Sequence, residues 1–249
     1  MGERFKEAAM PALGPSLAPS VSKPKAAGLF WLSVLLPWLV ACDPAPAPVV
    51  SIEQAPYYQD PALLDRAWRL PVAHFYRDRF EYQINSAFCG PATAINLFHS
   101  LDIPGRTQEN LFDHAPWRYW KTRLLGLNLD ELAEIVQDDA GLEITVLRDL
   151  TLETFRAHLR QSNNPAYRYL INFNRQPLFG VKIGHHSPIG GYLTERDLVF
   201  VLDVLERYQP FLAPSQRLYE AMDTVDRETG KKRGLLLVRK IGDAASGDP

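Results

Sequence analysis

The chain has 249 residues, of which 46% are hydrophobic and 22% are charged, and its formal net charge at pH 7 is −2. This is the composition of a globular protein with enough apolar residues for one sizeable domain, and it gives no reason to expect a nucleic-acid partner. The two cysteines cannot form a disulfide framework, and no CxxC or Cys/His spacing indicates a structural zinc site.

The first 42 residues have the pattern of a lipoprotein signal. A polar, proline-rich stretch ends in Lys23 and Lys25 and precedes sixteen uncharged residues, 26–41. A transmembrane helix needs about twenty such residues, whereas a basic flank, a short apolar segment and small final residues are typical of a secretory signal. The ending LVAC resembles a bacterial lipobox, in which the cysteine, here Cys42, is lipidated and becomes the new N-terminus.

The residues after this cysteine indicate where the protein is held. In some bacteria an aspartate such as Asp43 keeps a lipoprotein on the inner membrane, so we expect an exported protein on the periplasmic face of that membrane. An uncleaved single-pass anchor is the alternative, and either form would keep the chain at a membrane. Residues 43–54 are rich in proline and predict an extended tether. One domain is expected over 55–241 and a disordered tail over 242–249.

The domain shows helical patterns in its first half and more strand patterns in its second half. Helices are expected where apolar residues recur with helical spacing behind capping residues, at 61–70, 89–101, 128–141, 151–161 and 215–225. Strands are expected where alternation and β-branched residues predominate, at 142–149, 167–174, 187–193, 197–205 and 233–240. Helices followed by an antiparallel sheet predict an α+β fold.

Cys89 stands directly before Gly-Pro, at the start of a predicted helix. The dipole and the free N–H groups of a helix N-terminus stabilise a thiolate and so activate a cysteine as a nucleophile. A small buried core residue is the alternative interpretation, because free cysteines are among the most buried residues. A thiolate nucleophile also needs a base, and the base needs a group that orients it.

His185 and His186 are the candidates for the base among the six histidines, because they stand at the entry to a predicted strand. If residues 187–193 and 198–204 form a hairpin, Asp203 returns beside His185, close enough for an imidazole–carboxylate hydrogen bond. The chain order Cys, His, Asp is then compatible with a papain-like triad.

Two long segments, GHHSPIGGYLTERDLVFVLDV and LYEAMDTVDRETGKKRGLLLVRK, closely resemble the catalytic domain of phytochelatin synthases, the glutathione γ-glutamylcysteinyltransferases. FCGPAT matches the nucleophile motif of that family, and APWRYW resembles a family loop motif. The resemblance covers about residues 55–240, and its motifs follow the family's order. It implies a papain-like fold and cleavage of the Cys–Gly bond of glutathione through a γ-glutamylcysteinyl-enzyme thioester.

Position by position, the resemblance implies Cys89 as the nucleophile, His185 as the base and Asp203 as the acid that orients it. His186 occupies a position that varies in the family. Gln83, six residues before Cys89, matches the oxyanion-hole glutamine, whose amide would act with the Cys89 backbone N–H on the developing negative oxygen.

The γ-glutamyl end of glutathione carries an α-amino group and an α-carboxylate, so a site for it needs an acid and a guanidinium. Asp226 and Arg233, seven residues apart around a glycine turn, match the family's γ-glutamyl site. Arg175 matches a family arginine near the substrate, and Gly184 completes the predicted substrate-binding set. A solvated surface charge is the alternative for each of the charged residues.

The sequence does not decide whether water or a second glutathione accepts the acyl group. With no cysteine after Cys89, the chain resembles the short bacterial members, in which hydrolysis of glutathione to γ-glutamylcysteine and glycine often dominates over transfer to a second glutathione. No permanently bound cofactor and no protein metal site are expected, and Cd²⁺ or Zn²⁺ would enter as a metal–glutathione thiolate complex. Trp117 and Tyr119 are interpreted either as pocket-lining residues or as core aromatics.

The expected partners are therefore glutathione and a membrane, reached through the lipid anchor, while a homodimer is left open. A membrane-tethered papain-like peptidase acting on other peptides is the main alternative, and the Asp226 and Arg233 pair argues against it. A non-enzymatic binding module is a further alternative. The presence of all four predicted catalytic residues argues against it, namely Gln83, Cys89, His185 and Asp203.

Overall fold

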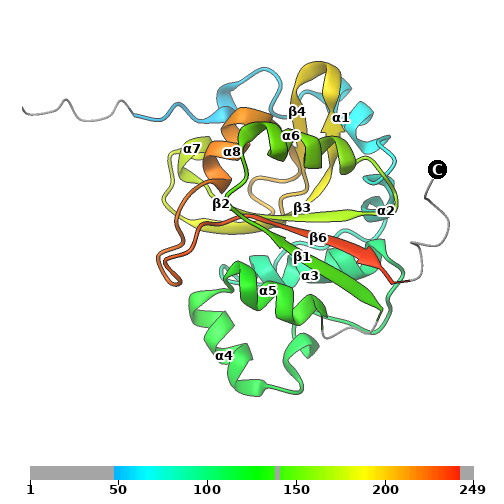
Figure 1. Ribbon diagram of the computed structural model, residues 1–249, viewed down its shortest axis with the longest axis vertical. Coiled ribbons are helices and arrows are strands. Elements are labelled where there is room, and N and C mark those ends of the chain that lie inside the picture. Colours follow the sequence, from blue (N-terminus) through cyan, green and yellow to red (C-terminus); the bar gives the residue numbers. More distant parts are fainter. Residues whose placement is uncertain (1–47, 138–140, 242–249) are drawn as a thin grey trace, which may run out of the picture. The chain divides into compact units, whose positions relative to one another are not determined.

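The structure is a computed structural model that describes residues 48–137 and 141–241 (Figure 1). The predicted signal segment, the first part of the predicted tether and the predicted C-terminal tail lie outside these residues. All described residues belong to one compact unit. Within the described ranges, no helix is both long and apolar enough to cross a bilayer.

The elements follow one another in a largely helical first half and a strand-rich second half. The helices are α1 (Pro61–Trp68), α2 (His74–Arg77), α3 (Cys89–Ser100), α4 (Pro116–Leu125), α5 (Leu129–Gln137), α6 (Leu152–Gln161), α7 (Gln176–Phe179) and α8 (Ser215–Met222), with 3-10 turns η1 (Ile52–Gln54), η2 (Asn110–Phe112) and η3 (Thr194–Arg196). The strands are β1 (Leu142–Leu147), β2 (Arg168–Asn174), β3 (Gly184–Leu193), β4 (Leu198–Val201), β5 (Phe211–Pro214) and β6 (Leu235–Lys240).

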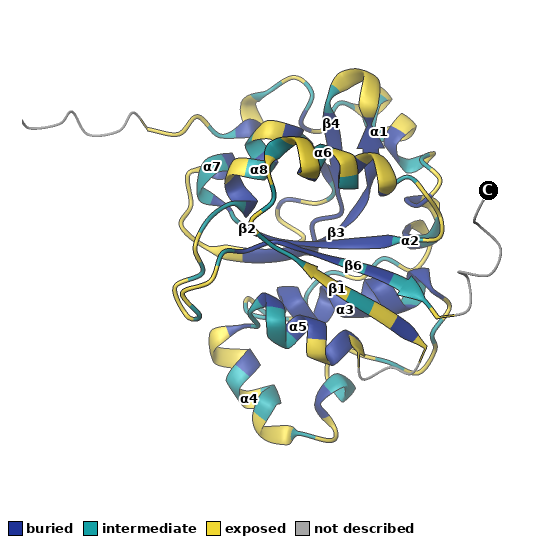
Figure 2. Ribbon diagram, viewed as in Figure 1, coloured by how far each residue is buried: buried dark blue, intermediate teal, exposed yellow. Residues whose placement is uncertain are grey.

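Six antiparallel strands form one sheet in the order β1-β6-β2-β3-β4-β5. Helices α3 and α5 lie on one side of this sheet and α6 and α8 on the other (Figure 1). Because successive side chains of a strand point to opposite faces, Ile171 and Phe173 of β2 pack with α6 and α8, whereas Leu170 packs with α3 and α5. The central strands are therefore buried on both faces (Figure 2). The predicted α+β class is confirmed.

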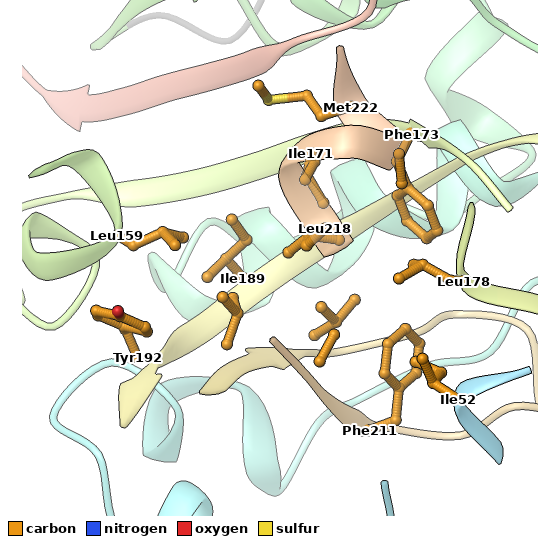
Figure 3. Packing of buried hydrophobic residues seen from close by; sticks show 14 of the residues in the cluster. Ile52, Leu159, Ile171, Phe173, Leu178, Ile189, Tyr192, Phe211, Leu218 and Met222 are labelled. Atoms are coloured by element: carbon orange, nitrogen blue, oxygen red, sulfur yellow. The ribbon is translucent and has the colours of Figure 1, made fainter. Parts of the chain in front are cut away.

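Figure 3 shows the core on the α8 side of the sheet, where Leu218 and Met222 of α8 pack over the side chains of β2 and β3. Ile52 of η1 is fully buried in the same cluster. The domain therefore begins before the expected position 55, because this turn contributes to the core.

Helix α3 places the candidate nucleophile inside the molecule. The predicted helix at 89–101 is observed at Cys89–Ser100, with Pro91 in the first turn, where a proline removes no helical hydrogen bond. Eleven of its residues are buried, because α3 packs against β3 and α5 beneath the sheet. The papain-like layout is present: the cysteine begins a buried helix that packs on an antiparallel sheet carrying the histidine.

The β3–β4 hairpin is present but differs from its prediction in its strand bounds and in its register. The second strand ends at Val201 and not at position 205, and the register shifts between Ile189 and Gly191, where Gly191 has a φ of +145° that favours glycine. The Leu202 N–H still donates to the Pro188 carbonyl over 3.0 Å. Asp203, the residue after Leu202, then leaves the sheet and turns toward His185 at the start of β3.

Several short elements were not expected from the sequence, namely α2, α7 and the three 3-10 turns, and two further unexpected elements bear on the site or the sheet. APWRYW, interpreted as a loop motif, contributes the first residues of helix α4, which starts with Pro116 at its first position. Strand β5 covers only four residues and adds an edge next to β4.

Candidate active site

Cys89 is the first residue of α3 and lies on the wall of a cavity of about 460 Å³. The residue is 8% exposed, and the cavity that it borders is where a ligand would approach it. The backbone N–H of a first helical residue has no acceptor within its own helix, which leaves the Cys89 N–H available as a hydrogen-bond donor.

His185 and Asp203 are brought together as predicted. The Nε2 atom of His185 lies 3.0 Å from Oδ1 of Asp203, and both side chains are buried. Since Nε2 faces the carboxylate, Nδ1 is the ring nitrogen left to interact with the Cys89 thiol, whose pKa His185 lowers. The Asp203 carboxylate also accepts the backbone N–H of Leu205 over 2.8 Å, which fixes the turn after β4.

The three side chains Cys89, His185 and Asp203 form a row, and the charges in this catalytic row favour an ionised thiol. Burial raises the pKa of the Cys89 thiol, but the hydrogen bond and the positive charge of His185 outweigh that effect, so the net pKa is lowered. For His185 burial lowers the pKa, and the Asp203 carboxylate reverses this, so the net pKa is raised. Burial likewise raises the pKa of Asp203, and the positive charges around it bring the net pKa below its ordinary value. Together these directions favour a thiolate–imidazolium pair.

Arg175 is where the structure corrects the predicted substrate-binding set. Its side chain is 2% exposed, it does not line the cavity, and its Nη2 atom donates to both carboxylate oxygens of Asp203, over 2.9 and 2.7 Å. A direct contact with substrate does not fit this burial. The sequence places Arg175 near the active site correctly, but on the side of Asp203 that faces the core.

Gln83 lies next to the site without lining the cavity. Its backbone N–H donates to the Val204 carbonyl over 2.8 Å, and its side-chain Nε2 donates to the Asn85 carbonyl over 2.7 Å. The amide nitrogen has a second hydrogen, which is the one that an oxyanion on the Cys89 side would use. The oxyanion role of Gln83 stays a prediction.

Asp226 and Arg233 form an ion pair in the wall of the cavity, with 3.0 Å between Arg233 Nη2 and Asp226 Oδ2. The glycine turn predicted between them is present, because the Asp226 N–H donates to the Lys231 carbonyl and Gly230 has a φ of +69°. The Arg233 side chain is 8% exposed and the Asp226 side chain is 18% exposed, and both line the cavity. Arg233 also donates from Nη1 to the Val225 carbonyl over 2.8 Å.

Gly184, the first residue of β3, lines the cavity beside this pair. A Cβ atom at this position would lie 2.8 Å from Nη2 of Arg233. The absence of a side chain therefore allows the guanidinium to lie directly against the start of β3, one residue before His185. This contact joins the ion pair to the catalytic row.

His186 lies on the opposite face of β3 from His185 and also lines the cavity. Its Nε2 atom is 2.9 Å from the Leu127 carbonyl and 2.8 Å from the side-chain nitrogen of Asn172. Burial is the main cause that lowers its pKa to about 4, so His186 is neutral at physiological pH. A neutral, hydrogen-bonded imidazole is suited to shaping the cavity wall and not to activating the thiol.

Sequence reasoning missed several wall residues. Asn172 and the end of α4, including Leu124 and Leu125, line the cavity, although nothing in their local pattern marks them. Trp117 is 69% exposed and does not line the cavity, while Tyr119 packs edge-on against Phe88 in the core. These two aromatics were interpreted either as pocket-lining residues or as core residues. Tyr119 is a core residue, and Trp117 is neither.

In residues 48–137 and 141–241, no group of three or more His, Cys, Asp or Glu side chains is arranged to hold a metal ion. The chemistry that the site can perform with its own residues is that of a nucleophilic thiolate with an oriented histidine.

Comparison with known proteins agrees with the motifs. The sequence model described as "Phytochelatin synthase" matches residues 62–235. Glutathione gamma-glutamylcysteinyltransferase 2 of Arabidopsis thaliana is 32% identical over 179 residues, which cover 65% of this chain and 38% of the plant protein. Glutathione gamma-glutamylcysteinyltransferase of Schizosaccharomyces pombe (strain 972 / ATCC 24843) is 26% identical over 175 residues, which cover 64% of this chain and 41% of the yeast protein. The matched segment thus spans well under half the length of these relatives.

Among solved structures, the peptidase domain of Streptococcus ComA, a bifunctional ABC transporter of a quorum-sensing pathway, is similar with a TM-score of 0.44 and 14% sequence identity. The similarity covers 64% of this chain and 96% of the ComA domain.

Proposed function

The chain belongs to the phytochelatin synthase family, and on this premise we propose that it is a thiol acyltransferase or hydrolase that cleaves the Cys–Gly bond of glutathione. The observation that carries the proposal is that one cavity contains both a Cys89 thiol paired with His185 and an accessible acid–guanidinium pair, Asp226 and Arg233. A nucleophile alone fits many acyl-transfer enzymes, whereas the second pair fits a substrate with a free amino acid head group.

The acylation step uses the thiolate–imidazolium pair. The Cys89 thiolate attacks the carbonyl carbon of the Cys–Gly peptide bond, and the negative charge that develops on the oxygen is met by the Cys89 backbone N–H. The imidazolium of His185 gives its proton to the nitrogen of glycine as the C–N bond breaks. Glycine leaves with that proton, and γ-glutamylcysteine remains bound to the sulfur as a thioester.

The second step regenerates the thiol. Neutral His185 takes a proton from water, or from the α-amino group of a second glutathione, as the oxygen or nitrogen attacks the thioester carbon. Water gives γ-glutamylcysteine, and glutathione gives (γ-Glu-Cys)₂-Gly. Both outcomes share the acyl-enzyme, and we propose that this protein carries out the hydrolysis at least. Cd²⁺ or Zn²⁺ would enter as part of the metal–glutathione substrate.

The head group of the substrate fits the ion pair in the wall. In the proposed complex, Asp226 accepts hydrogen bonds from the α-ammonium group of the γ-glutamyl residue, and Arg233 binds its α-carboxylate. Arginine suits this task because its planar fork matches a carboxylate. An ordinary α-linked peptide has neither of these groups at the same distance from the scissile bond.

The test is incubation of the full chain, in detergent, with glutathione in the presence and absence of Cd²⁺ or Zn²⁺, with products followed by mass spectrometry. We expect glycine and γ-glutamylcysteine in equal amounts, a transient γ-glutamylcysteinyl adduct on Cys89, and no turnover by Cys89→Ala. Formation of (γ-Glu-Cys)₂-Gly would add the transferase activity. Unchanged glutathione, or turnover that survives in Cys89→Ala, would overturn the proposal, and cleavage of α-linked peptides alone would identify a peptidase.

We also propose that lipid on Cys42 holds the protein at the periplasmic face of a bacterial inner membrane. The support is the sequence of residues 26–42, a short uncharged segment that follows two lysines and ends in LVAC. Labelling cells with a fatty-acid analogue and fractionating their membranes tests this. Cys42→Ala should lose the label, and a labelled Cys42→Ala chain would contradict the proposal.

A further inference from the structure

The Arg175–Asp203 ion pair is sealed inside the protein. The two side chains are 2% and 0% exposed, and Nη2 of Arg175 lies 2.9 and 2.7 Å from the two carboxylate oxygens. Burying such a pair removes both charges from water, so an apolar pair of similar volume is often as stable or more stable. Fold stability alone therefore does not account well for this arginine.

The guanidinium is held in place from several sides. Arg175 directly follows β2, and its backbone N–H donates to the Ile183 carbonyl over 2.8 Å. Its Cζ atom lies 4.0 Å from the ring centre of Tyr208, 5.4 Å from that of Phe179 and 5.7 Å from that of Phe173. These rings attract a cation and leave it little freedom to turn.

The carboxylate between Arg175 and His185 is held equally firmly. Oδ1 of Asp203 accepts from the Leu205 N–H and from Arg175, and it faces Nε2 of His185. Oδ2 accepts from Arg175. The orientation that Asp203 presents to His185 thus depends on the arginine behind it.

We propose that Arg175 is a positioning residue of the active site, which fixes the Asp203 carboxylate toward His185 and acts through it on the Cys89 thiol. The inference rests on the proposed function and deepens it, since it extends the row Cys89–His185–Asp203 by one buried member. Arg175 does not touch the substrate, because the cavity does not reach it.

The groups that face Asp203 give the sign of the expected pH effect. They are the cation Arg175, the imidazole of His185, and the phenols of Tyr58 and Tyr82, which are neutral near pH 7 since burial raises the pKa of both. The positive charge of Arg175 lowers the pKa of Cys89 as well as the pKa of His185. Removing it should therefore move the titration of both groups to higher pH.

The first measurement follows alkylation of Cys89 by iodoacetamide against pH, using the full chain and mass spectrometry that resolves the Cys89 peptide from the Cys42 peptide. Arg175→Met should raise the alkylation midpoint by about one pH unit, which slows the reaction about tenfold on the acid side of the curve. Arg175→Lys, which keeps the charge, should restore a midpoint near that of the wild type.

Arg168→Met is the matched control. Arg168 stands at the other end of β2, is 3% exposed and donates to the hydroxyl and the carbonyl of Ser100. Loss of this buried arginine should destabilise the fold as well, while leaving the Cys89 midpoint unchanged. If Arg175→Met does not fold, Arg175→Gln replaces it, because glutamine can donate to Asp203 without carrying a charge.

The second measurement follows glutathione turnover, in which Arg175→Met should lower kcat with little change in KM. Three results of the alkylation experiment would each overturn the inference. The first is a wild-type Cys89 midpoint in Arg175→Met or Arg175→Gln, and the second is an equal shift of the midpoint in Arg168→Met. The third is a midpoint in Arg175→Lys that stays as high as that of Arg175→Met. Alkylation uses no glutathione, so a protein that fails to cleave glutathione would contradict the proposed function and still allow this inference to be judged.

Discussion

The site contains two arginine–aspartate pairs that differ in their access to solvent, Arg175–Asp203 and Arg233–Asp226. The first is sealed, with its members 2% and 0% exposed, and it has the imidazole of His185 as a neighbour. The second lines the cavity, with its members 8% and 18% exposed. The same two side-chain types thus meet different surroundings: one pair includes Asp203 of the catalytic row, and the other lines the cavity.

The difference shows that access, and not residue type, decides what an ion pair can do. A sealed pair cannot exchange partners with a ligand, so its effect passes through the groups that it touches, and its field is strong because little water screens it. A pair that lines the cavity, which we call open, can replace its mutual contact with contacts to the charged groups of a substrate. We therefore assign positioning to Arg175 and substrate recognition to Arg233.

The largest expected effect comes from breaking the sealed pair at its shared carboxylate. Asp203→Asn should lower kcat/KM for glutathione about 10⁴-fold, because the amide no longer orients and stabilises the protonated His185. It should also reduce the free energy of unfolding by about 3–5 kcal/mol, because Arg175 is left buried without a counter-charge. Product analysis and urea unfolding measure the two effects, and kcat/KM within tenfold of the wild type would contradict the assignment.

The next effect concerns His186, which lines the cavity together with Asp226 and Arg233. Its pKa falls from 6.5 to about 4 on folding, so the unfolded chain binds a proton first as the pH is lowered. The stability that this group contributes is therefore complete above pH 6.5 and is lost as the pH falls toward 4, by up to about 3 kcal/mol. In urea unfolding at several pH values, His186→Phe should lack this part of the pH dependence. A variant with the wild-type slope would show that the imidazole is not kept neutral by burial.

The smallest expected effect comes from the open pair. Arg233→Met or Asp226→Asn should raise the KM for glutathione roughly tenfold to a hundredfold, the size of a lost charge-assisted hydrogen bond, and leave the alkylation profile of Cys89 unchanged. N-acetyl-Cys-Gly, which lacks both charged groups of the γ-glutamyl residue, is the matched control substrate, and the variants should handle it like the wild type. An unchanged KM for glutathione would remove the pair from substrate recognition.

Much of the fold follows from local pattern. Thr151 caps α6, with its hydroxyl oxygen 3.1 Å from the Thr154 backbone nitrogen, and Asn128 and Glu131 form the reciprocal cap of α5. These contacts join residues three apart, so the sequence carries them directly. Strand β5 was missed because a four-residue strand has too short a pattern to stand out, and its pairing with β4 is a tertiary contact.

The sequence by itself determined the position of Cys89 at a helix start, the return of Asp203 to His185, and the turn that joins Asp226 to Arg233. Helix starts and short turns depend on neighbours in the chain, so their residues can be identified from spacing. Only the tertiary structure decided that Arg175 is sealed and Arg233 is open. The partners of Arg175 lie up to 33 positions away, and the burial of a charge depends on which distant surfaces pack over it.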